Sequence, residues 1–157
     1  EFLVDAGFRP EEIKPARLEV TDLLAQTYRQ KNFDKARYIV AQTMRVRSVD
    51  VARINATSGK IGSLVKRGVV VSDYGGPSYF FTGLNQIKPD MIAMATRNAR
   101  SAAARFAQDA GTRVGGIRHA SQGVFQILPR DRGDGNERSA IEKTIRIVAT
   151  VNYALDR

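Results

Sequence analysis

The sequence contains no cysteine, and it has one histidine, at position 119. The lack of cysteine excludes disulfides, thiolate metal sites and cysteine nucleophiles. No apolar run approaches the roughly 18–20 residues that a membrane-spanning helix needs, so we expect the printed chain not to cross a bilayer. Nor does it open with a signal peptide. With one histidine and no fixed partner for it, His119 is expected to be structural and not catalytic.

Acidic residues are too few to balance the basic ones, and the formal net charge is +9 with a pI near 10.3. Clustered arginine and lysine would favour nucleic acid or anionic lipid as a partner. Here the basic residues are spread along the chain, and no recognisable nucleic-acid motif accompanies them. A solvated basic surface is therefore the favoured interpretation, and nucleic acid is not the expected partner. Polyanion binding is the alternative, with its predicted contacts on the central helix at Arg97, Arg100 and Arg105.

With 157 residues, 43% of them hydrophobic, the chain is predicted to be one globular domain spanning positions 1–157. It does not begin with Met, and Glu1 to Val4 is typical of the last turns of a helix that ends at Gly7. We therefore expect the domain to lack an N-terminal strand and the start of its first helix. Any targeting segment or membrane anchor is expected to lie further upstream.

The stretch from Leu84 to Gly111 is the strongest secondary-structure signal. Apolar residues recur at steps of three and four, which predicts one buried stripe of a helix: Ile92, Ala95, Ala99, Ala102, Phe106 and Ala110. Pro89 suits a first helical turn and Gly111 suits a left-handed cap. Because the stripe is mostly alanine, the helix is expected to lie close against a sheet.

Strands are predicted on both sides of this helix. Ala36 to Arg47 alternates cleanly, with Tyr38, Val40, Gln42, Met44 and Val46 facing one way. Before it we expect a strand from Ala16 to Leu24 and a hairpin loop from Gln26 to Lys35. After it, Ser48 is predicted to cap a helix that stops at Gly68. Further strands are predicted at Val69–Val71, Ser78–Thr82, Thr112–Ala120, Val124–Leu128 and Ile141–Leu155, with a loop at Arg130–Arg138.

The chain also resembles itself at one constant offset. The residues Phe2, Asp5, Ala6, Gly7, Arg9, Ile13 and Val20 recur as Phe106, Asp109, Ala110, Gly111, Arg113, Ile117 and Val124. Each copy would end a helix at the same cap and enter a strand, a loop and a long alternating strand. A duplicated helix–strand–strand unit predicts an α+β fold, in which two hairpins merge into one antiparallel or mixed sheet with helices on one face. One face of the sheet should be rich in Arg and Thr, and the other apolar.

Several tracts resemble bacterial SIMPL-domain proteins, over nearly the whole chain. They are Gly76–Pro89, the helix ending FAQDAG, Gly115–Ile117, Gln122–Phe125 and the closing KTIRIVATVNYAL. The resemblance implies a non-enzymatic α+β module without agreed catalytic residues and without a cofactor. It also implies a periplasmic or cell-envelope location, a loose link to stress response, and assembly into rings.

Two loops are candidate ligand sites. Gly59-Lys60 lacks the Ser or Thr and the first Gly that a phosphate loop requires, so we reject it. Asp131 to Asn136, with Glu142 further on, offers carboxylates for a hard cation such as Ca²⁺, but its spacing does not match an EF-hand. A solvated hairpin loop is the favoured interpretation, and no metal site is predicted.

The densest aromatic tract lies beside a Gly-Gly-Pro turn. Core packing is its first interpretation, and a subunit or ligand contact is the second. The residues of this possible interaction patch are Tyr74, Pro77, Tyr79 and Phe81.

Taken together, the sequence favours a non-catalytic envelope module that acts by self-assembly or by binding an unknown protein partner. A polyanion-binding protein is the second hypothesis. A hydrolytic enzyme is the third, and it requires serine or carboxylate groups that converge only in three dimensions.

Overall fold

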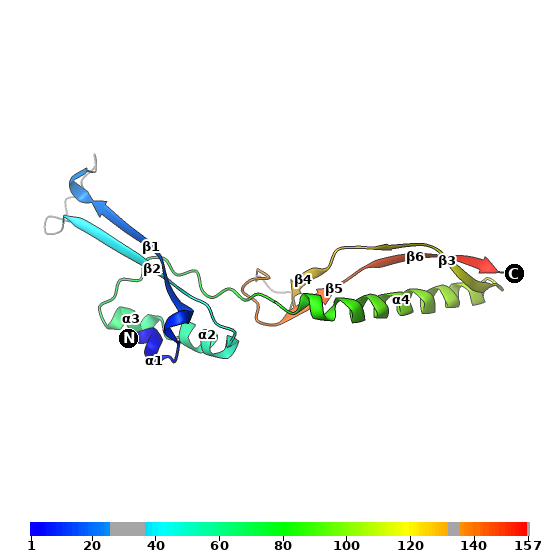
Figure 1. Cartoon of the computed structure of the whole chain (residues 1–157), viewed down its shortest axis with the longest axis horizontal. Helices are drawn as coiled ribbons and strands as arrows, with labels where there is room; N and C mark the ends of the chain where they lie inside the picture. The colour runs from blue at the N-terminus through cyan, green and yellow to red at the C-terminus, as the bar shows by residue number, and fades with distance from the viewer. Residues whose placement is uncertain (26–36, 132–135, 157) are drawn as a thin grey trace. The chain divides into compact units, whose positions relative to one another are not determined.

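The computed structural model describes residues 1–25, 37–131 and 136–156. It contains helices and antiparallel β-ladders, which confirms the predicted α+β class. The chain divides into two compact units, Glu1–Pro77 and Ser78–Arg157 (Figure 1). The prediction of a single domain over 1–157 stays a prediction, and the two units are described in turn.

The first unit is a hairpin with short helices at its base. Figure 1 shows α1, α2 and α3 gathered at one end of the β1–β2 ladder, with the rest of both strands projecting from them. Its elements are α1 (Phe2–Asp5), the 3₁₀ turn η1 (Pro10–Glu12), β1 (Ile13–Asp22), the 3₁₀ turn η2 (Leu23–Ala25), β2 (Tyr38–Val46), α2 (Val51–Ser58) and α3 (Gly62–Lys66).

The β1–β2 ladder confirms the strand predicted within Ala36 to Arg47, with bounds Tyr38–Val46, and its side chains are exposed on both faces. Val20 lies opposite Val40, and Ile13 lies opposite Val46. The register shifts by one residue between Pro15 and Arg17, which is a β-bulge on the first strand. The predicted strand from Ala16 to Leu24 is found with shifted bounds, because Leu23 and Leu24 belong to the 3₁₀ turn η2. The predicted loop Gln26–Lys35 lies outside the described residues.

The helix predicted after Ser48 forms as two pieces, α2 and α3, on either side of Gly59. The predicted N-cap, Ser48, lies two residues before the observed one. Asp50 is the N-cap, and its carboxylate accepts the Arg53 amide at 2.9 Å. Ser48 instead accepts the Asp50 amide at 3.2 Å, so its hydroxyl closes the turn before the helix. The chain reverses after α3 at Gly68, which has φ +82° as expected of a helix stop.

The second unit is one long helix on a long hairpin. Its elements are α4 (Leu84–Asp109), β3 (Arg113–Gln122), β4 (Gln126–Pro129), β5 (Lys143–Arg146) and β6 (Ala149–Asp156). β3 pairs with β6 and β4 pairs with β5, both antiparallel. The predicted final strand is therefore interrupted between β5 and β6, where the Gly123 amide donates to the Val148 carbonyl.

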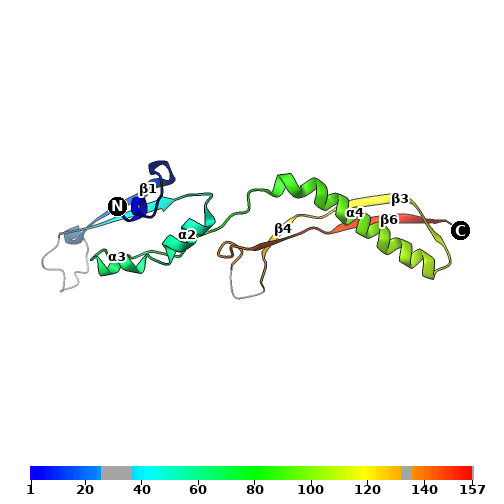
Figure 2. The same cartoon turned by 90° about the horizontal axis from the view of Figure 1, so that it is seen from below.

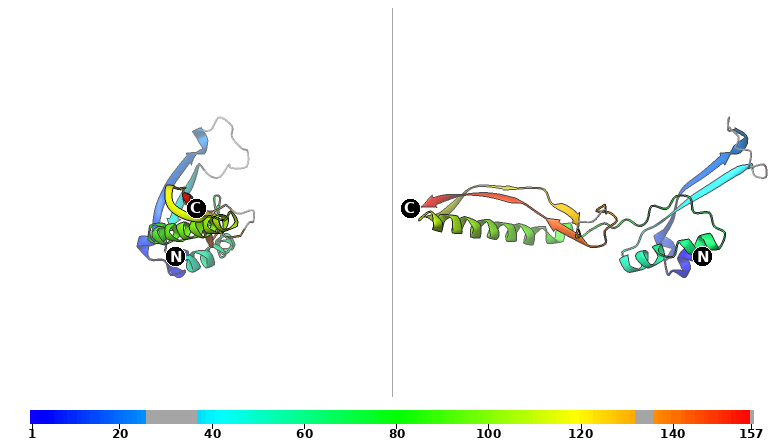
Figure 3. Two further views of the ribbon diagram at one scale, coloured as in Figure 1. Left: turned by 90° about the vertical axis from the view of Figure 1, so that its right-hand side faces the viewer. Right: turned by 180° about the vertical axis from the view of Figure 1, so that it is seen from behind.

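α4 begins earlier than Pro89 suggests. The helix starts at Leu84, so Pro89 lies inside it and not in its first turn. It packs along β3 and β6, and the view from behind shows it running beside both strands (Figure 3). From β5 to β6, the apolar side chains Ile145, Ile147, Ala149, Val151 and Tyr153 are less exposed than the residues between them, which is the predicted alternation.

The buried stripe of α4 differs from the predicted one in its second half. Ala107 is 2% exposed, whereas the predicted core residue Phe106 is 76% exposed. Ala102 and Ala110 are also exposed. The partly or fully buried row is Ala95, Ala99, Ala103 and Ala107, at steps of four. A step-of-four row is inclined to the helix axis, and α4 crosses its hairpin obliquely in Figure 2.

The strand ladders do not merge into the single sheet that the repeat predicted. In residues 1–25, 37–131 and 136–156, the strands form three two-stranded ladders, β1–β2, β3–β6 and β4–β5. Two predicted strands, Val69–Val71 and Ser78–Thr82, are not strands in the structure. Near the second of these, the Tyr79 amide donates to the Arg138 carbonyl at 2.7 Å. Strong β-propensity in these two stretches therefore does not by itself produce a strand.

The two helix ends at Gly7 and Gly111 share one geometry. Three backbone hydrogen bonds recur at the repeat offset: Ala6 to Phe2 and Ala110 to Phe106, Gly7 to Val4 and Gly111 to Gln108, Phe8 to Leu3 and Thr112 to Ala107. Both glycines have positive φ, at 83° and 66°. The caps therefore form as the sequence predicted. Duplication of the whole unit stays a prediction.

Little of the apolar surface is buried. Among the described residues, only three apolar side chains are less than a tenth exposed: Phe8, Tyr79 and Ala107. No helix in the described part of the chain is both long and apolar enough to cross a membrane.

Candidate interaction surfaces

The β1–β2 hairpin has one apolar face that the described residues of its own unit leave exposed. Cross-strand partners share a face in an antiparallel ladder. Leu18, Val20 and Val40 are 64%, 60% and 63% exposed. Tyr38 and Met44 on the same face are also exposed. We call these five residues the apolar face of the hairpin.

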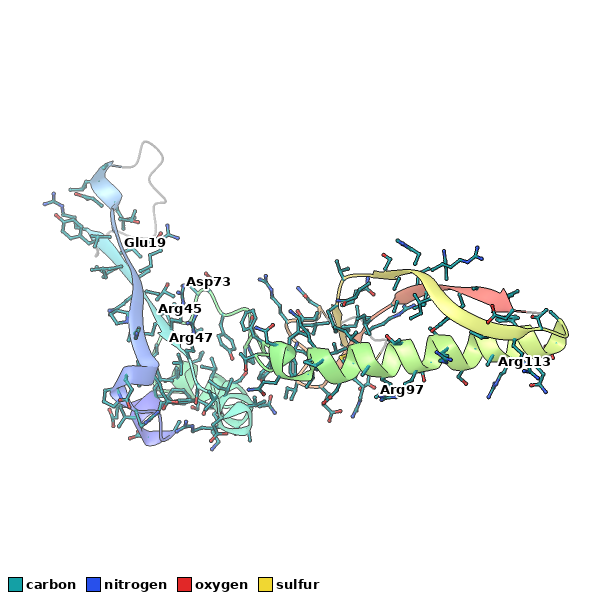
Figure 4. The ribbon with its side chains drawn as sticks, turned by 45° about the vertical axis from the view of Figure 1, so that its right-hand side comes forward. Glu19, Arg45, Arg47, Asp73, Arg97 and Arg113 are labelled. Carbon is teal, nitrogen blue, oxygen red and sulfur yellow. The ribbon has the colours of Figure 1, made fainter. Side chains whose placement is uncertain are left out.

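The opposite face of the same hairpin is basic. Lys14 and Arg45 lie directly across the ladder from each other, and Arg47 extends the row at the end of β2. Figure 4 shows Arg45 on β2, Arg47 just after the end of β2, and Glu19 further along β1. Glu19 forms an ion pair with Arg17, its neighbour on this face. In the described part of the chain, Lys14, Arg45 and Arg47 have no carboxylate partner.

A charged cluster fixes the base of the hairpin. Arg53 of α2 donates to the Gly7 carbonyl, to Glu12 Oε1 at 3.0 Å and to Ser48 Oγ at 3.0 Å. Its guanidinium also lies 4.8 Å from the centre of the Phe8 ring. Glu12 is 8% exposed and accepts the Arg9 amide at 2.9 Å through Oε2.

The surroundings of Glu12 favour its ionised form. The Ser48 hydroxyl, then the Arg9 amide and the Arg53 and Arg9 charges, lower the pKa of this carboxyl below its ordinary value, against an opposing effect of burial. A carboxylate held ionised by donors on several sides is a structural tie. Its oxygens are occupied, so it is not available as a general base.

The three arginines predicted to bind polyanions are all exposed on α4. Figure 4 places Arg97 on the side of α4 turned away from the β3–β6 hairpin. Among the described residues, Arg97, Arg100 and Arg105 have no ion pair. Arg100 also lines an open hollow of ≈ 490 Å³ where α4 ends and β3 begins. The other lining residues are Ala104, Ala107, Gln108, Thr112, Arg113 and Val114.

The four residues of the predicted aromatic patch fall in different units. Tyr74 and Pro77 belong to the first unit, and Tyr79 and Phe81 to the second. The Tyr74 hydroxyl lies 2.6 Å from the Ser58 hydroxyl and its ring is exposed. Tyr79 is buried, as the core-packing interpretation expects, and its neighbours Phe80 and Phe81 are exposed. Tyr79 is thus a poor contact for a partner.

In the loop considered for Ca²⁺, the carboxylates of Asp131 and Glu142 form ion pairs with an arginine. Arg130 pairs with Asp131 at 3.3 Å and also with Glu142. Positions 132–135, including Gly133, Asp134 and Gly135, lie outside the described residues. Within residues 1–25, 37–131 and 136–156, no group of three or more His, Asp or Glu side chains is placed to hold a metal ion. His119 is exposed on β3 opposite Asn152.

A family comparison bears on the identity of the chain. The model of the SIMPL family, described as proteins of unknown function (DUF541), matches residues 1–153. The chain belongs to the SIMPL family. Membership confirms the resemblance read from the Gly76–Pro89 tract and the FAQDAG helix end. No curated protein matches this SIMPL chain.

Sequence reasoning missed the Arg53 cluster and the bare hairpin face. Arg53 sits three residues after the N-cap, so it looks like one more surface arginine of an amphipathic helix. The alternation did identify the apolar face, but alternation reports which side chains share a face and not whether another element covers it. Only the tertiary structure shows that α1, α2 and α3 lie at one end of the β1–β2 ladder.

Proposed function

We propose that this SIMPL chain is a non-catalytic module that acts by associating with other polypeptides, either copies of itself or another protein. The observation that carries the proposal is the amount of apolar surface left on the folded chain. Leu18, Val20 and Val40 are exposed on one hairpin, and Phe106 on α4. Contiguous apolar patches of this kind mark interaction sites in soluble proteins.

The total surface supports the same proposal. The chain exposes 12,933 Å² at a mass of 17.3 kDa. A compact monomer of this mass exposes about 7,800 Å², and two separate compact domains of half the mass about 9,400 Å². The excess over two domains is therefore about 3,500 Å². Permanent complexes bury roughly 2,000–5,000 Å² counted over both partners, which is about 1,000–2,500 Å² on each, so the excess on this chain is more than one such interface would cover.

Open strand edges add backbone groups that a partner can satisfy. Each ladder has only two strands, so each strand has one unpaired edge. An unpaired edge of eight to ten residues, as in β1, β2, β3 and β6, offers a row of free amides and carbonyls to another chain. Association through strands is thus compatible with both units.

A cell-envelope location and a loose link to stress defence complete this proposal, and the resemblance to bacterial SIMPL-domain proteins supports both. Tethering would run through a segment upstream of Glu1. Fractionation of cells that express the full-length protein tests the location. Recovery of the protein in the cytoplasmic fraction alone would contradict it.

Sedimentation velocity of the purified full-length protein over a wide concentration range tests the association. We expect a species heavier than the monomer at all but the lowest concentrations. Two results together would overturn the proposal. The purified protein would be strictly monomeric at high concentration, and the protein recovered from gently crosslinked cells would carry no covalently attached partner. The absence of catalysis is tested separately, by screening the purified protein for hydrolase activity. We expect none, and activity that stays with the protein through purification would contradict this part of the proposal.

Polyanion binding is the second candidate, and the exposed unpaired arginines of α4 favour it. We expect the triple variant Arg97→Ala, Arg100→Ala, Arg105→Ala to elute from heparin at lower salt than the parent protein, because each phosphate or sulfate contact releases counterions. The matched control removes three arginines that already have carboxylate partners, Arg17, Arg67 and Arg130. Equal shifts for the two triples would show a general effect of net charge and no site on α4.

A further inference from the structure

The hollow at the end of α4 lies wholly within the second unit, and a small side chain keeps it open. Arg100, Ala104 and Gln108 follow one another at steps of four, so they lie on one side of the helix. Ala104 places only a methyl group between the two longer side chains. The volume of ≈ 490 Å³ falls in the range of about 300–1,000 Å³ that small-ligand sites have.

The lining of this hollow has an apolar part and a polar part. The apolar part consists of Ala104, Ala107 and Val114, and the Ala107 side chain is almost fully buried. Small-ligand sites typically combine such an apolar surface with a few polar groups that fix the orientation of the ligand. The polar part consists of Arg100, Gln108, Thr112 and Arg113.

The polar groups left available in the hollow are hydrogen-bond donors. The Ala107 carbonyl accepts the amide and the hydroxyl of Thr112 at 2.8 and 3.3 Å, and the Gln108 carbonyl accepts the Gly111 amide at 3.1 Å. These bonds occupy carbonyls at the end of the helix. In contrast, the guanidiniums of Arg100 and Arg113 form no ion pair with any of the described residues.

The carboxylate opposite Arg113 is directed elsewhere. Asp156 is the partner of Arg113 in the β3–β6 ladder, but its Oδ2 would lie 2.6 Å from a Cβ added at Gly115. The carboxylate therefore occupies the space that the glycine leaves free. Figure 4 shows Arg113 where β3 begins, next to the last turns of α4. Of the described residues that line the hollow, none is acidic, so its two positive charges favour an anion.

We propose that this hollow binds a small carboxylate that carries a short apolar group. The guanidiniums of Arg100 and Arg113 hold the carboxylate, because their planar fork of donors matches its two oxygens. The apolar group lies on the alanines and the valine of the lining. A short aliphatic acid and the free C-terminus of a short peptide share this chemistry. The site does not depend on the proposed association, and either stands if the other fails.

Methyl NMR of the full-length protein, with isotope labels in the alanine methyl groups, tests the site. With sodium hexanoate we expect saturable shifts at Ala104 and Ala107, and no shift at Ala102, which is exposed on α4 outside the hollow. Hexanamide, which has the same chain without the charge, should cause none. N-acetyl-Ala-Val with a free carboxylate, compared with hexanoate, distinguishes the two sources, since the tighter of the two probes identifies the class. No saturable shift with either acid, or equal shifts with hexanamide, would overturn the proposal.

Variants of the arginines separate this site from a general effect of charge. We expect Arg100→Gln and Arg113→Gln each to raise the Kd of the tighter probe about tenfold, because each removes a charge-assisted hydrogen bond. Arg97→Gln is the matched control, since Arg97 is also exposed on α4 but does not line the hollow. It should leave Kd unchanged. Equal losses in Arg97→Gln and Arg113→Gln would overturn the site, and the polyanion candidate would be unaffected by that result.

A second pair of variants tests the hollow itself. Ala104→Leu fills the space between Arg100 and Gln108, and we expect it to abolish the shift at Ala107. Ala102→Leu adds the same atoms outside the hollow and should bind as the parent does. Both positions are exposed, and circular dichroism checks that both variants fold. Unchanged binding by Ala104→Leu would show that the acid binds elsewhere, and the proposal would be wrong.

Discussion

Glu12 shows how a single carboxylate ties the first unit together. It comes from the 3₁₀ turn before β1, and its partners come from the turn before α2 and from α2 itself, at Ser48 and Arg53. The same guanidinium holds the carbonyl of Gly7 in the helix cap. Arg53 thereby connects α2 to two neighbouring segments near the N-terminus, the cap at Gly7 and the turn at Glu12. Because Glu12 is nearly buried, removal of its partner would leave an uncompensated charge, which costs more than breaking an exposed pair.

The lowered pKa of Glu12 predicts how stability changes with pH. A carboxyl whose folded pKa lies below its unfolded value stabilises the fold above the unfolded pKa, and the contribution is lost as the pH falls through the folded pKa. Unfolding midpoints in urea should thus decline below about pH 4.5, the ordinary value. In Glu12→Gln we expect a lower midpoint at neutral pH and a flatter profile in acid. Glu11→Gln, which changes only an exposed pair with Arg9, is the control and should follow the parent.

The two cap glycines make a second prediction at this scale. Gly7 and Gly111 both have positive φ, and a Cβ at Gly111 would meet no atom within 4 Å, so any penalty comes from the backbone alone. We expect Gly111→Ala to destabilise the chain by about 1–2 kcal/mol in urea unfolding followed by circular dichroism. Gly62→Ala is the control, because Gly62 has no positive φ and free space around it. It should be neutral or gain up to about 1 kcal/mol. Equal losses would mean that the cap geometry is wrong.

At the scale of elements, two rows of residues on α4 could face the β3–β6 hairpin, and only one of them does. The predicted stripe and the observed one share Ala95 and Ala99, then separate toward the end of the helix. Alanines at steps of four let the backbone approach β3 and β6 closely, and Phe106 is left on the flank. Helical periodicity permits both rows, so the choice depends on the twist of the hairpin beneath.

Neighbouring substitutions on α4 distinguish the two stripes. Ala107→Leu inserts methylene groups where the side chain is almost fully buried, and overpacking of this kind costs about 1–3 kcal/mol. Phe106→Leu changes an exposed ring, and we expect the stability to stay within about 0.5 kcal/mol. Urea midpoints of the two variants give the comparison. The reverse order of effects would restore the stripe predicted from the sequence.

At the scale of the whole molecule, the proposed association would contribute to the stability of the fold. The described residues bury only Phe8, Tyr79 and Ala107 among their apolar side chains, which is little for a chain of this length. Folding has to offset the conformational entropy of ordering the chain, and buried apolar surface is the main favourable contribution. Under the proposed function, surface that is covered on association with other polypeptides supplies the missing contribution.

This dependence predicts that thermal stability rises with protein concentration. Association of folded chains stabilises them by mass action, so each increase in concentration should raise Tm. Val40→Lys, which places a charge on the exposed apolar face of the β1–β2 hairpin, should have a Tm that depends less on concentration, and Ala41→Lys, on the opposite face, should behave as the parent. Calorimetry at several concentrations makes the measurement. A Tm independent of concentration in the parent would show that the chain is stable without a second copy.

How much was predictable can be seen from particular segments. The alternation from Tyr38 to Val46, the bounds of the central helix near Asp109 and the glycine stops at Gly7 and Gly111 were all visible, because each depends on residues close in the chain. The strands expected at Val69–Val71 and Ser78–Thr82 were wrong, since β-propensity gives a strand only where another strand is available for pairing.

By itself, then, the sequence determined the α+β class, the family, the two caps and the separation of apolar from basic residues on β2, since periodicity and backbone preference are local properties. Only the tertiary structure decided that the ladders stay separate, that Arg53 joins Glu12 to Gly7, and that Ala107 and not Phe106 faces the hairpin. The reason is physical: these outcomes depend on which distant surfaces meet, and the free energy of such contacts is not contained in any one segment.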